Sequence, residues 1–480
     1  MKKIKTLILV ITFLSKLSSQ TFYPSLNISL LSVIDPEVSF SNPASWQQKY
    51  SGCWGWYQVS KNKEYAIIGS ASGAYFIDVT NPLLPVVNDS VKVDNHAIHR
   101  EIKTYSHYAY ITTDEQGGRT CIVDLQYLPD SIHEIPSSTL PQRAHTLFIE
   151  GSHLYMELAE LPPAAAPTAS FVTGLAVYDL ILPEAPTLLR YIEQDYASVS
   201  VGGCLAHDVF VNNDTIFASC QGNGLKIYRF TPTNTFSLMA TYSNYIQAGY
   251  NHSSWLSEDR KHLVFCDEVP TGLSAKIIDV QNFSNIVLTD TFKSHAGATA
   301  HNPYIVGNRW CWLSSYEDGI YLYDISNPNQ VSTYGFIDTR PAHGFNDGYP
   351  DDYQGNWGAY PFLPSKIVLT LDQQNGLFIL DGDNTYKSSL VTSTFPSSNN
   401  AIELNVFPNP MGDNIEISAY TTDYLNLTYS LIDILGRTVF VGTLKNAKTN
   451  VNTEHLAPGL YHLSITNEKH TKLKTLKLIK

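Results

Sequence analysis

Residues 300–328, AHNPYIVGNRWCWLSSYEDGIYLYDISNP, decide the fold of this chain. The stretch opens with His301, continues as an alternating apolar run, turns at Glu317-Asp318-Gly319 and ends in a second run over residues 320–324. Period-two alternation bounded by Gly, Asp, Asn and Pro predicts two short antiparallel strands. The same pattern occurs seven times in the sequence.

The seven copies are spaced like the blades of a propeller. Their closing positions lie 46, 55, 50, 50, 45 and 57 residues apart, at Asp78, Asp124, Asp179, Arg229, Asp279, Asp324 and Asp381. A period of roughly 40–50 residues of pure strand pattern is typical of β-propellers. We interpret the repeated aspartates as turn-forming caps, because they precede Asn-Pro or similar turns. The sequence therefore predicts an all-β fold built on a seven-bladed β-propeller.

The two ends of the chain carry other segments. Residues 1–19 are predicted as a secretory signal peptide, because lysines precede a short apolar run and small residues follow it. The propeller is expected over residues 20–391, with a strand at 27–35 completing the last blade and removing an open sheet edge. A Ser-, Thr-, Asn- and Pro-rich linker at 392–401 leads to a small β-sandwich at 402–480.

Composition limits the partners and the cysteine chemistry. The net charge is −13, and because phosphate binding needs a basic surface, no nucleic acid partner is expected. No transmembrane helix is expected either, since no apolar run reaches roughly 18 residues. Six cysteines allow many pairings, and we select Cys220 and Cys266 for testing because they occupy similar places in adjacent repeats.

One residue in each repeat stands at the start of the first predicted strand. These residues are Trp54, His99, His145, His207, His252, His301 and Trp357. The innermost strands of a propeller line its central channel, so we expect these side chains to gather at one mouth of the channel.

The histidines have two interpretations. Converging imidazoles are common ligands of divalent transition metals, and nearby acids could complete such a site. The candidate metal ligands are His207, His252, His301, Asp208, Asp267 and Glu268, with Asp347, Asp351 and Asp352 in a loop before Trp357. Alternatively, each histidine hydrogen-bonds the backbone of the neighbouring blade. The two tryptophans favour this structural role, because indole is not a metal ligand.

The C-terminal segment contains three motifs, Phe407-Pro-Asn-Pro410, Asp433-Ile-Leu-Gly-Arg437 and Leu456-Ala-Pro-Gly-Leu-Tyr461, followed by a basic end. With them the segment resembles the sorting domain of the Bacteroidetes type IX secretion system. Their sorting-motif positions are Pro408, Asn409, Pro410, Gly436, Arg437, Gly459 and Tyr461. The resemblance implies type IX secretion machinery as a partner and removal of this domain. It also implies release of the mature protein or its attachment to the cell surface.

The repeats resemble the choice-of-anchor B family, whose repeats are related to LVIVD repeats. The similar segments include Tyr250-Asn-His-Ser-Ser-Trp255 and Gly355-Asn-Trp-Gly-Ala-Tyr-Pro-Phe-Leu-Pro-Ser365. The family implies a propeller at the cell surface and no defined activity, and His99 stands where the family often has Trp.

Three functions stay open on the sequence. The first is a secreted or cell-surface propeller that binds an extracellular ligand or partner without turnover. The second is a metal-dependent enzyme of hydrolase type that uses the histidine ring with a bound water. The third is a structural or adhesion component of the cell surface.

Overall fold

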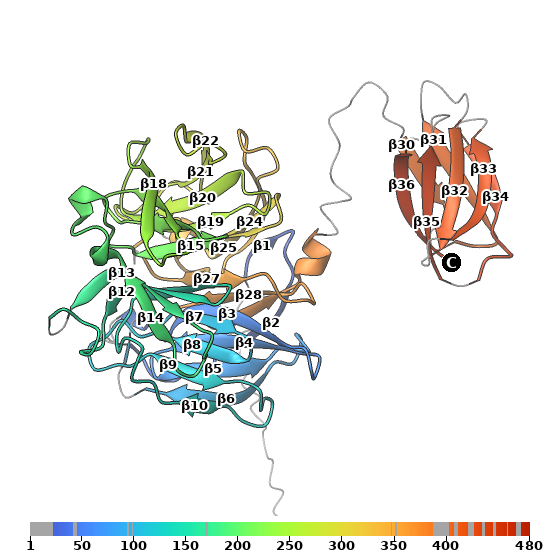
Figure 1. Cartoon of the computed structure of the whole chain (residues 1–480). Helices are drawn as coiled ribbons and strands as arrows, with labels where there is room; N and C mark the ends of the chain where they lie inside the picture. Colours follow the sequence, from blue (N-terminus) through green and yellow to red (C-terminus); the bar gives the residue numbers. More distant parts are fainter. Residues whose placement is uncertain are drawn as a thin grey trace, which may run out of the picture. The chain divides into compact units, whose positions relative to one another are not determined.

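The computed structural model describes residues 23–41, 46–93, 96–97, 99–168, 171–346, 348–350 and 353–386, and, further on, residues 403–407, 411–420, 427–433, 437–444, 448–457, 459–466 and 472–480. The chain forms two compact units, Met1–Ser389 and Leu390–Lys480 (Figure 1). The predicted signal peptide and linker, together with Asp347, Asp351 and Asp352, lie outside the described residues.

The described part of the first unit contains seven antiparallel sheets of consecutive strands. The first sheet contains β3 (Tyr50–Gln58), β4 (Lys63–Ser70), β5 (Gly73–Asp78) and β6 (Val86–Lys92). The second contains β7 (Ile102–Tyr105), β8 (Tyr108–Ile111), β9 (Cys121–Asp124) and β10 (His133–Ile135). The third contains β11 (Thr146–Glu150), β12 (His153–Glu160), β13 (Val172–Asp179) and β14 (Thr187–Tyr191). The next two contain β15 (Asp208–Asn212), β16 (Thr215–Ser219), β17 (Leu225–Phe230) and β18 (Phe236–Tyr242); and β19 (Asn251–Leu256), β20 (His262–Asp267), β21 (Ala275–Asp279) and β22 (Val287–Phe292). The last two contain β23 (Pro303–Val306), β24 (Trp310–Ser314), β25 (Ile320–Asp324) and β26 (Ser332–Ile337); and β27 (Asn356–Tyr360), β28 (Val368–Asp372) and β29 (Gly376–Leu380). Short 3-10 turns are η2 (Ile192–Gln194), η3 (Val199–Val201) and η4 (Gly344–Asn346).

The sheets form a closed circle. The first strands contact one another in chain order, β3 with β7 and so on to β27, and β27 contacts β3. The segment before the first repeat completes the last two sheets. There β1 (Ser25–Leu26) pairs with β26, and β2 (Leu30–Ile34) pairs antiparallel with β29. The outer strand of the last sheet therefore comes from the beginning of the chain.

The core lies between neighbouring sheets. Middle strands such as β20 and β21 are almost wholly buried, whereas the outer strand β18 alternates between buried or half-buried and exposed residues. Between the first two sheets, Ile67 and Phe76 pack in one apolar cluster with Ala109 and Val123. Because both faces of the middle strands are covered, these strands are continuous apolar runs, and only the outer strands keep a solvated face.

The prediction that the closing aspartates cap turns is confirmed. Their Oδ1 atoms accept backbone hydrogen bonds of 2.9–3.0 Å, donated by Thr80, Gln126, Ile181, Gln281, Ser326 and Asn384. Each bond makes the chain turn back immediately after the third strand of its sheet.

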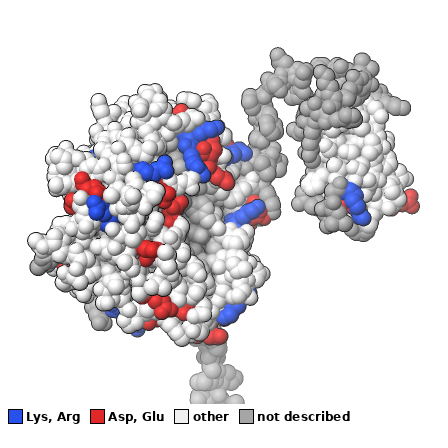
Figure 2. Space-filling model, viewed as in Figure 1, with Lys and Arg blue, Asp and Glu red and all other residues white. Residues whose placement is uncertain are grey.

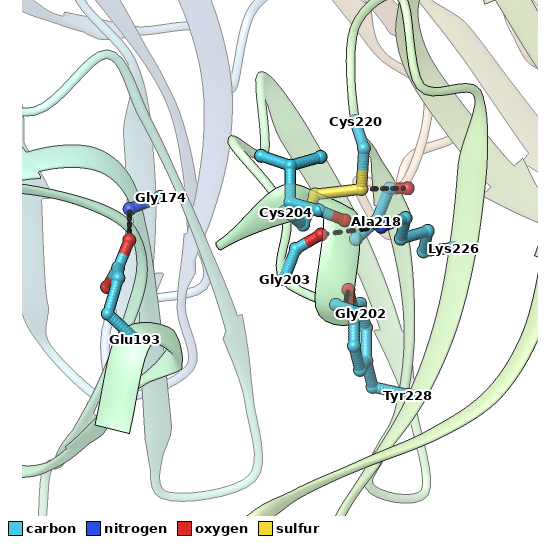
Figure 3. The surroundings of a disulfide bond; sticks show 10 residues. Gly174, Glu193, Gly202, Gly203, Cys204, Ala218, Cys220, Lys226 and Tyr228 are labelled. Atoms are coloured by element: carbon cyan, nitrogen blue, oxygen red, sulfur yellow. Dashed lines mark hydrogen bonds between the residues drawn. A yellow bond between two sulfur atoms is a disulfide. The ribbon is translucent and has the colours of Figure 1, made fainter. Parts of the chain in front are cut away.

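The predicted pairing of Cys220 with Cys266 is wrong. Cys220 forms a disulfide with Cys204, in the segment that leads into β15 (Figure 3). The equivalent positions of adjacent repeats lie in separate apolar clusters: Cys204 and Cys220 share one cluster, whereas Cys266 packs with Cys311 in another. Cys53, Cys121, Cys266 and Cys311 are buried free thiols.

Replacing Cys204 and Cys220 together by serine is expected to lower the free energy of unfolding by about 3 kcal/mol. The bridge closes a loop with a sequence separation of 16, which restricts the unfolded chain by about this amount. Urea unfolding of the double variant against wild type measures the loss. Thiol labelling of the denatured protein checks the pairing: it should label four cysteines before reduction and six after it. Labelling of all six without reduction would contradict the bridge.

The second unit has a small core of its own. Its two sheets contain β30 (Glu403–Phe407), β31 (Asn414–Tyr420) and β34 (Lys448–Asn452), and β33 (Thr438–Leu444), β32 (Leu427–Asp433), β35 (Leu460–Thr466) and β36 (Lys472–Ile479). Ile417, Leu431 and Leu463 are buried in one cluster whose members all lie in this unit.

The described sorting-motif residues hold turns in the second unit. Arg437 donates from Nε to Asp433 at 2.7 Å, and the Tyr461 hydroxyl donates to the Ala457 carbonyl at 2.8 Å. Gly459 exchanges two backbone hydrogen bonds with Lys480. The motif residues Pro408, Asn409, Pro410 and Gly436 lie outside the described residues.

Charged side chains are sparse on the face of the molecule that Figure 2 shows. Acidic and basic groups are interspersed there, and uncharged residues cover most of the described surface. Among the described residues of the chain, several charges are paired, such as Arg309 with Asp324 at 2.8 Å and Arg119 with Glu134 at 2.8 Å. Neither sign therefore dominates this face.

Candidate functional site

Six of the seven predicted channel residues form a closed circle of rings in edge-on, tilted or stacked contact. The centroid distances are 5.4 Å between His99 and His145, 4.2 Å between His145 and His207, and 4.2 Å between His207 and His252. The circle continues with 4.4 Å from His252 to His301, 4.7 Å from His301 to Trp357 and 5.3 Å from Trp357 back to His99. Each ring stands just before or at the start of the first strand of its sheet. The repeated position therefore builds one site from six sheets.

Trp54 is the exception, and its assignment to this circle is corrected. The residue in register with His252 and Trp357 is Ser51, because the bulge in β3 falls between Tyr50 and Cys53. The ring of Trp54 instead packs on Tyr360 at 4.7 Å, and the ring is absent from the lining of the cavity described below.

Backbone anchoring fixes the orientation of two imidazoles. His207 donates from Nδ1 to the carbonyl of His252 at 3.0 Å, and His301 donates from Nδ1 to the carbonyl of Trp357 at 2.6 Å. A carbonyl only accepts, so Nδ1 carries the proton in both rings. These contacts cross from one sheet to the next, which is the structural role that the sequence left open. They leave Nε2 of His301 without a hydrogen-bond partner among the described residues, whereas Nε2 of His207 contacts His145.

His145 is held by a carboxylate that the sequence analysis did not single out. Its Nδ1 donates to Asp114 at 2.7 Å, and its Nε2 lies 2.7 Å from Nε2 of His207. Burial alone would raise the pKa of Asp114, but hydrogen bonds from His145 and His99 hold it well below its usual range. Asp114 follows no repeat-wide pattern, so only the folded structure identifies it.

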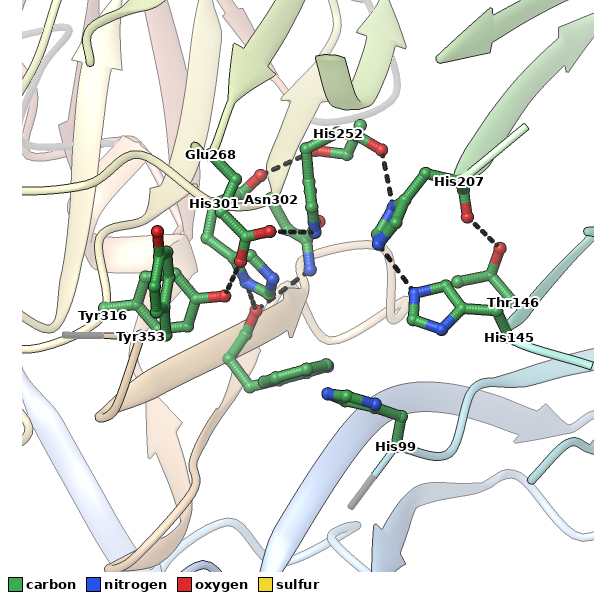
Figure 4. A network of polar contacts seen from close by, with 12 residues as sticks. His99, His145, Thr146, His207, His252, Glu268, His301, Asn302, Tyr316 and Tyr353 are labelled. Carbon is green, nitrogen blue, oxygen red and sulfur yellow. Dashed lines mark hydrogen bonds and ion pairs between the residues drawn. The ribbon is translucent and has the colours of Figure 1, made fainter. Parts of the chain in front are cut away.

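A cavity of about 510 Å³ opens at this circle. Its wall includes the five histidines of the circle and Trp357. Further aromatic rings from the first strands and from loops extend it: Trp46, Phe148, Trp255, Tyr304, Tyr316 and Tyr353. Figure 4 shows the imidazoles of His99, His145, His207 and His252 turned toward one central space. The five predicted histidines therefore line one cavity, and their place at the mouth of a propeller channel stays a prediction.

The three predicted acids have different positions. Glu268 lines the cavity, with Oε2 3.8 Å from Nε2 of His252. Asp208 also lines the cavity, where burial raises its pKa to about 7. Asp267 is not available as a metal ligand, because it forms an ion pair of 2.7 Å with Lys276 and both side chains are fully buried. The prediction for Asp267 is therefore wrong.

Burial keeps the central imidazoles neutral. It lowers the pKa of His207 and His301 well below 6.5, and it lowers the pKa of His252 as well. The neighbouring histidines lower these values further, because two imidazolium charges would repel one another. At neutral pH the site therefore presents imidazole lone pairs, which can accept hydrogen bonds or bind a cation.

Two groups of side chains in the described residues have ligand atoms within 4.8 Å of one another. One is His99, Asp114 and His145, and the other is His252, Glu268 and His301. The second group contains three of the predicted metal ligands. His207 is in neither group, because its Nε2 faces His145.

Comparisons with known proteins agree on the fold and on export. Residues 405–480 match the family described as a secretion system C-terminal sorting domain. No curated protein matches the chain.

Among solved structures, the chain is similar to one described as the extracellular domain of a putative hybrid two-component system from B. thetaiotaomicron. The two sequences are 12% identical and the TM-score is 0.50. The match covers 94% of this chain and 57% of that chain. It is also similar to the WD40 β-propeller domain of Doa1, with 10% identity, a TM-score of 0.48 and coverage of 74% of this chain and 96% of that chain. A third similar structure is YCF48 from Cyanidioschyzon merolae, with 8% identity, a TM-score of 0.48 and coverage of 73% and 98%.

The closed circle of mostly four-stranded antiparallel sheets gives the first unit the arrangement of a β-propeller. Among the described residues, no helix is long and apolar enough to cross a membrane. The matched tail is a type IX sorting domain, which directs its carrier out of the cell. The chain is thus a β-propeller protein that its C-terminal sorting domain sends to the cell surface.

Proposed function

We propose that this protein binds a small extracellular ligand in the histidine-lined cavity, without turning it over. The observation that carries the proposal is the cavity of about 510 Å³, which lies inside the roughly 300–1,000 Å³ range of ligand pockets. Its lining residues come from first strands, their entry loops and the segments that follow second strands, and the closed circle of sheets holds these in place. Such a rigid frame lowers the entropy cost of ordering a ligand.

The finer architecture belongs to the same proposal. We infer that the seven sheets are the blades of a seven-bladed propeller of choice-of-anchor B type, with domain limits at 20–391 and 402–480. The two sheets of the C-terminal unit are then a β-sandwich. Supporting this are the closed circle of first strands and the pairing of β2 with β29.

The wall of the cavity suits a polar molecule that contains a ring. Trp46 is 47% exposed at the cavity, and Trp357 is stacked on His99, so two indoles are placed where a sugar ring could stack. Glu268 and Asn302 add polar groups among the aromatic rings. Aromatic rings beside convergent polar groups are typical of small-ligand sites.

Tryptophan fluorescence tests the proposal directly, because Trp46, Trp255 and Trp357 line the cavity. The full chain, treated with a chelator, is titrated with mono- and disaccharides, and at least one sugar is expected to give a saturable change. Trp46→Ala should weaken binding by about tenfold while leaving the fold intact, because this ring is half exposed. A flat response to every sugar would refute the ligand class. Equal affinity in the Trp46→Ala variant would refute the location.

A further inference from the structure

We propose that His252, Glu268 and His301 bind one divalent transition-metal ion, with the cavity supplying an open coordination position. The inference goes beyond the proposed function and rests on these three side chains alone. Metal binding without a sugar ligand, and sugar binding without metal, are therefore separate and distinguishable results.

The spacing of the donor atoms fits a common ion. The ligand atoms of the three residues lie within 4.8 Å of one another, and Nε2 of His252 is 3.8 Å from Oε2 of Glu268. That separation is too long for a hydrogen bond. Ligands bound at about 2.0–2.2 Å to one ion stand roughly 3–4 Å apart. The two atoms are thus placed as two ligands of one ion would be.

An orphaned nitrogen points to the same place. Nε2 of His301 is fully buried and has no hydrogen-bond partner among the described residues. The Nδ1 proton is fixed by the Trp357 carbonyl at 2.6 Å, so Nε2 keeps its lone pair. Metal-binding histidines in proteins usually donate their other nitrogen to a carbonyl or carboxylate in this way. A buried lone pair without a donor is costly, and a cation would satisfy it.

Glu268 is oriented for the same role. The Tyr316 hydroxyl donates to its Oε1, which leaves Oε2 turned to His252. The ring of Tyr316 also packs on His301 at 4.3 Å and so holds the third ligand (Figure 4). One tyrosine therefore supports two members of the set, as second neighbours of metal ligands commonly do.

The other group of three is already satisfied without an ion. In this group, Nδ1 of His145 donates a hydrogen bond to Oδ2 of Asp114, and the two atoms are 2.7 Å apart. Arg143 approaches the second oxygen of Asp114 at 3.5 Å and adds positive charge. A cation there would have to displace the proton and face the guanidinium. The group of His252, Glu268 and His301 has neither obstacle.

The donor set indicates the class of metal. Two imidazoles and one carboxylate suit Zn²⁺ and related transition ions far better than Mg²⁺ or Ca²⁺, which prefer oxygen ligands. Three protein ligands leave one position of a tetrahedral ion open, and all three residues line the cavity. A water or an anionic group of a ligand would occupy that position.

Zn²⁺ titration of the full-length, chelator-treated protein tests the inference, with Co²⁺ absorption as a second readout. Wild type is expected to bind one Zn²⁺ per chain. Glu268→Gln keeps the size of the side chain and its bond from Tyr316, so it should fold, and it should bind Zn²⁺ at least about 100-fold more weakly. His252→Gln should behave in the same way, and both should lose the Co²⁺ spectrum.

His145→Gln is the matched control, because it disrupts the other group and leaves these three residues in place. It should bind Zn²⁺ like wild type. Loss of Zn²⁺ in His145→Gln with retention in Glu268→Gln would overturn the assignment. Wild-type protein that binds no Zn²⁺ would overturn it as well.

Discussion

A chain that ends at residue 389 is expected to fold normally and to remain inside the cell envelope in a host with a type IX secretion system. The sorting unit has its own core, and the apolar cluster of that core draws no residue from the propeller. Its removal therefore takes no buried side chain from the first unit. Fractionation should find the full chain outside the cells, and essentially all of the truncated chain should be retained.

The truncation needs a test of folding beside the test of export. The truncated protein should show the same cooperative melting transition for the first unit as the full chain. Val441→Ser is the control variant, because Val441 is 59% exposed on the sorting unit and its change should leave export intact. Export of the truncated chain at the wild-type level would contradict the assignment of the tail.

Lys276→Met is expected to lower the free energy of unfolding by about 3–5 kcal/mol, because it leaves Asp267 charged and without its cation in the core. The two side chains are fully buried and 2.7 Å apart. Asp267 also accepts a hydrogen bond of 2.9 Å from Tyr245 and one from Asn251, the first residue of β19. Since His252 follows Asn251, the loss should also disturb the candidate metal site.

Two comparisons isolate the buried charge. Lys276→Met combined with Asp267→Asn removes both charges, and it should recover most of the lost stability. Lys261→Met removes the 52%-exposed partner of Asp259, a surface pair, and should cost less than about 1 kcal/mol. Urea unfolding measures all four proteins. A cost for Lys276→Met as small as that of Lys261→Met would refute the argument.

The repeats made much of this fold predictable. Closing aspartates such as Asp78 and Asp324 mark the end of the third strand because a turn must follow there, and that requirement is local. The histidines gather because equivalent positions of consecutive sheets face one channel. Both inferences need only the period and the geometry of a strand, and both are visible in a single sequence.

The errors arise where local irregularity or long-range packing decides. Trp54 has the right distance from Asp78, but a bulge shifts the register and places Ser51 at the repeated position. At the bulge, the backbone of Arg100 lies so close to Gly52 that a side chain at position 52 would clash with the Arg100 carbonyl. Asp267 looked like a ligand beside Glu268, yet it ends β20 with its side chain in a fully buried ion pair with Lys276. Its partner Lys276 lies in the next strand, and no pattern in the sequence pairs them.

The strap formed by β1 and β2 has a consequence for the timing of folding. β1 pairs with β26, and β2 pairs with β29. The N-terminal strands of the propeller can therefore pair only after its C-terminal strands have been synthesised. Contacts between the two ends of the propeller form slowly, because a long loop has to be closed first. Until then the free edge of β29 is open to strands of other molecules. The last two sheets are therefore complete only when both ends of the propeller are present in the same place.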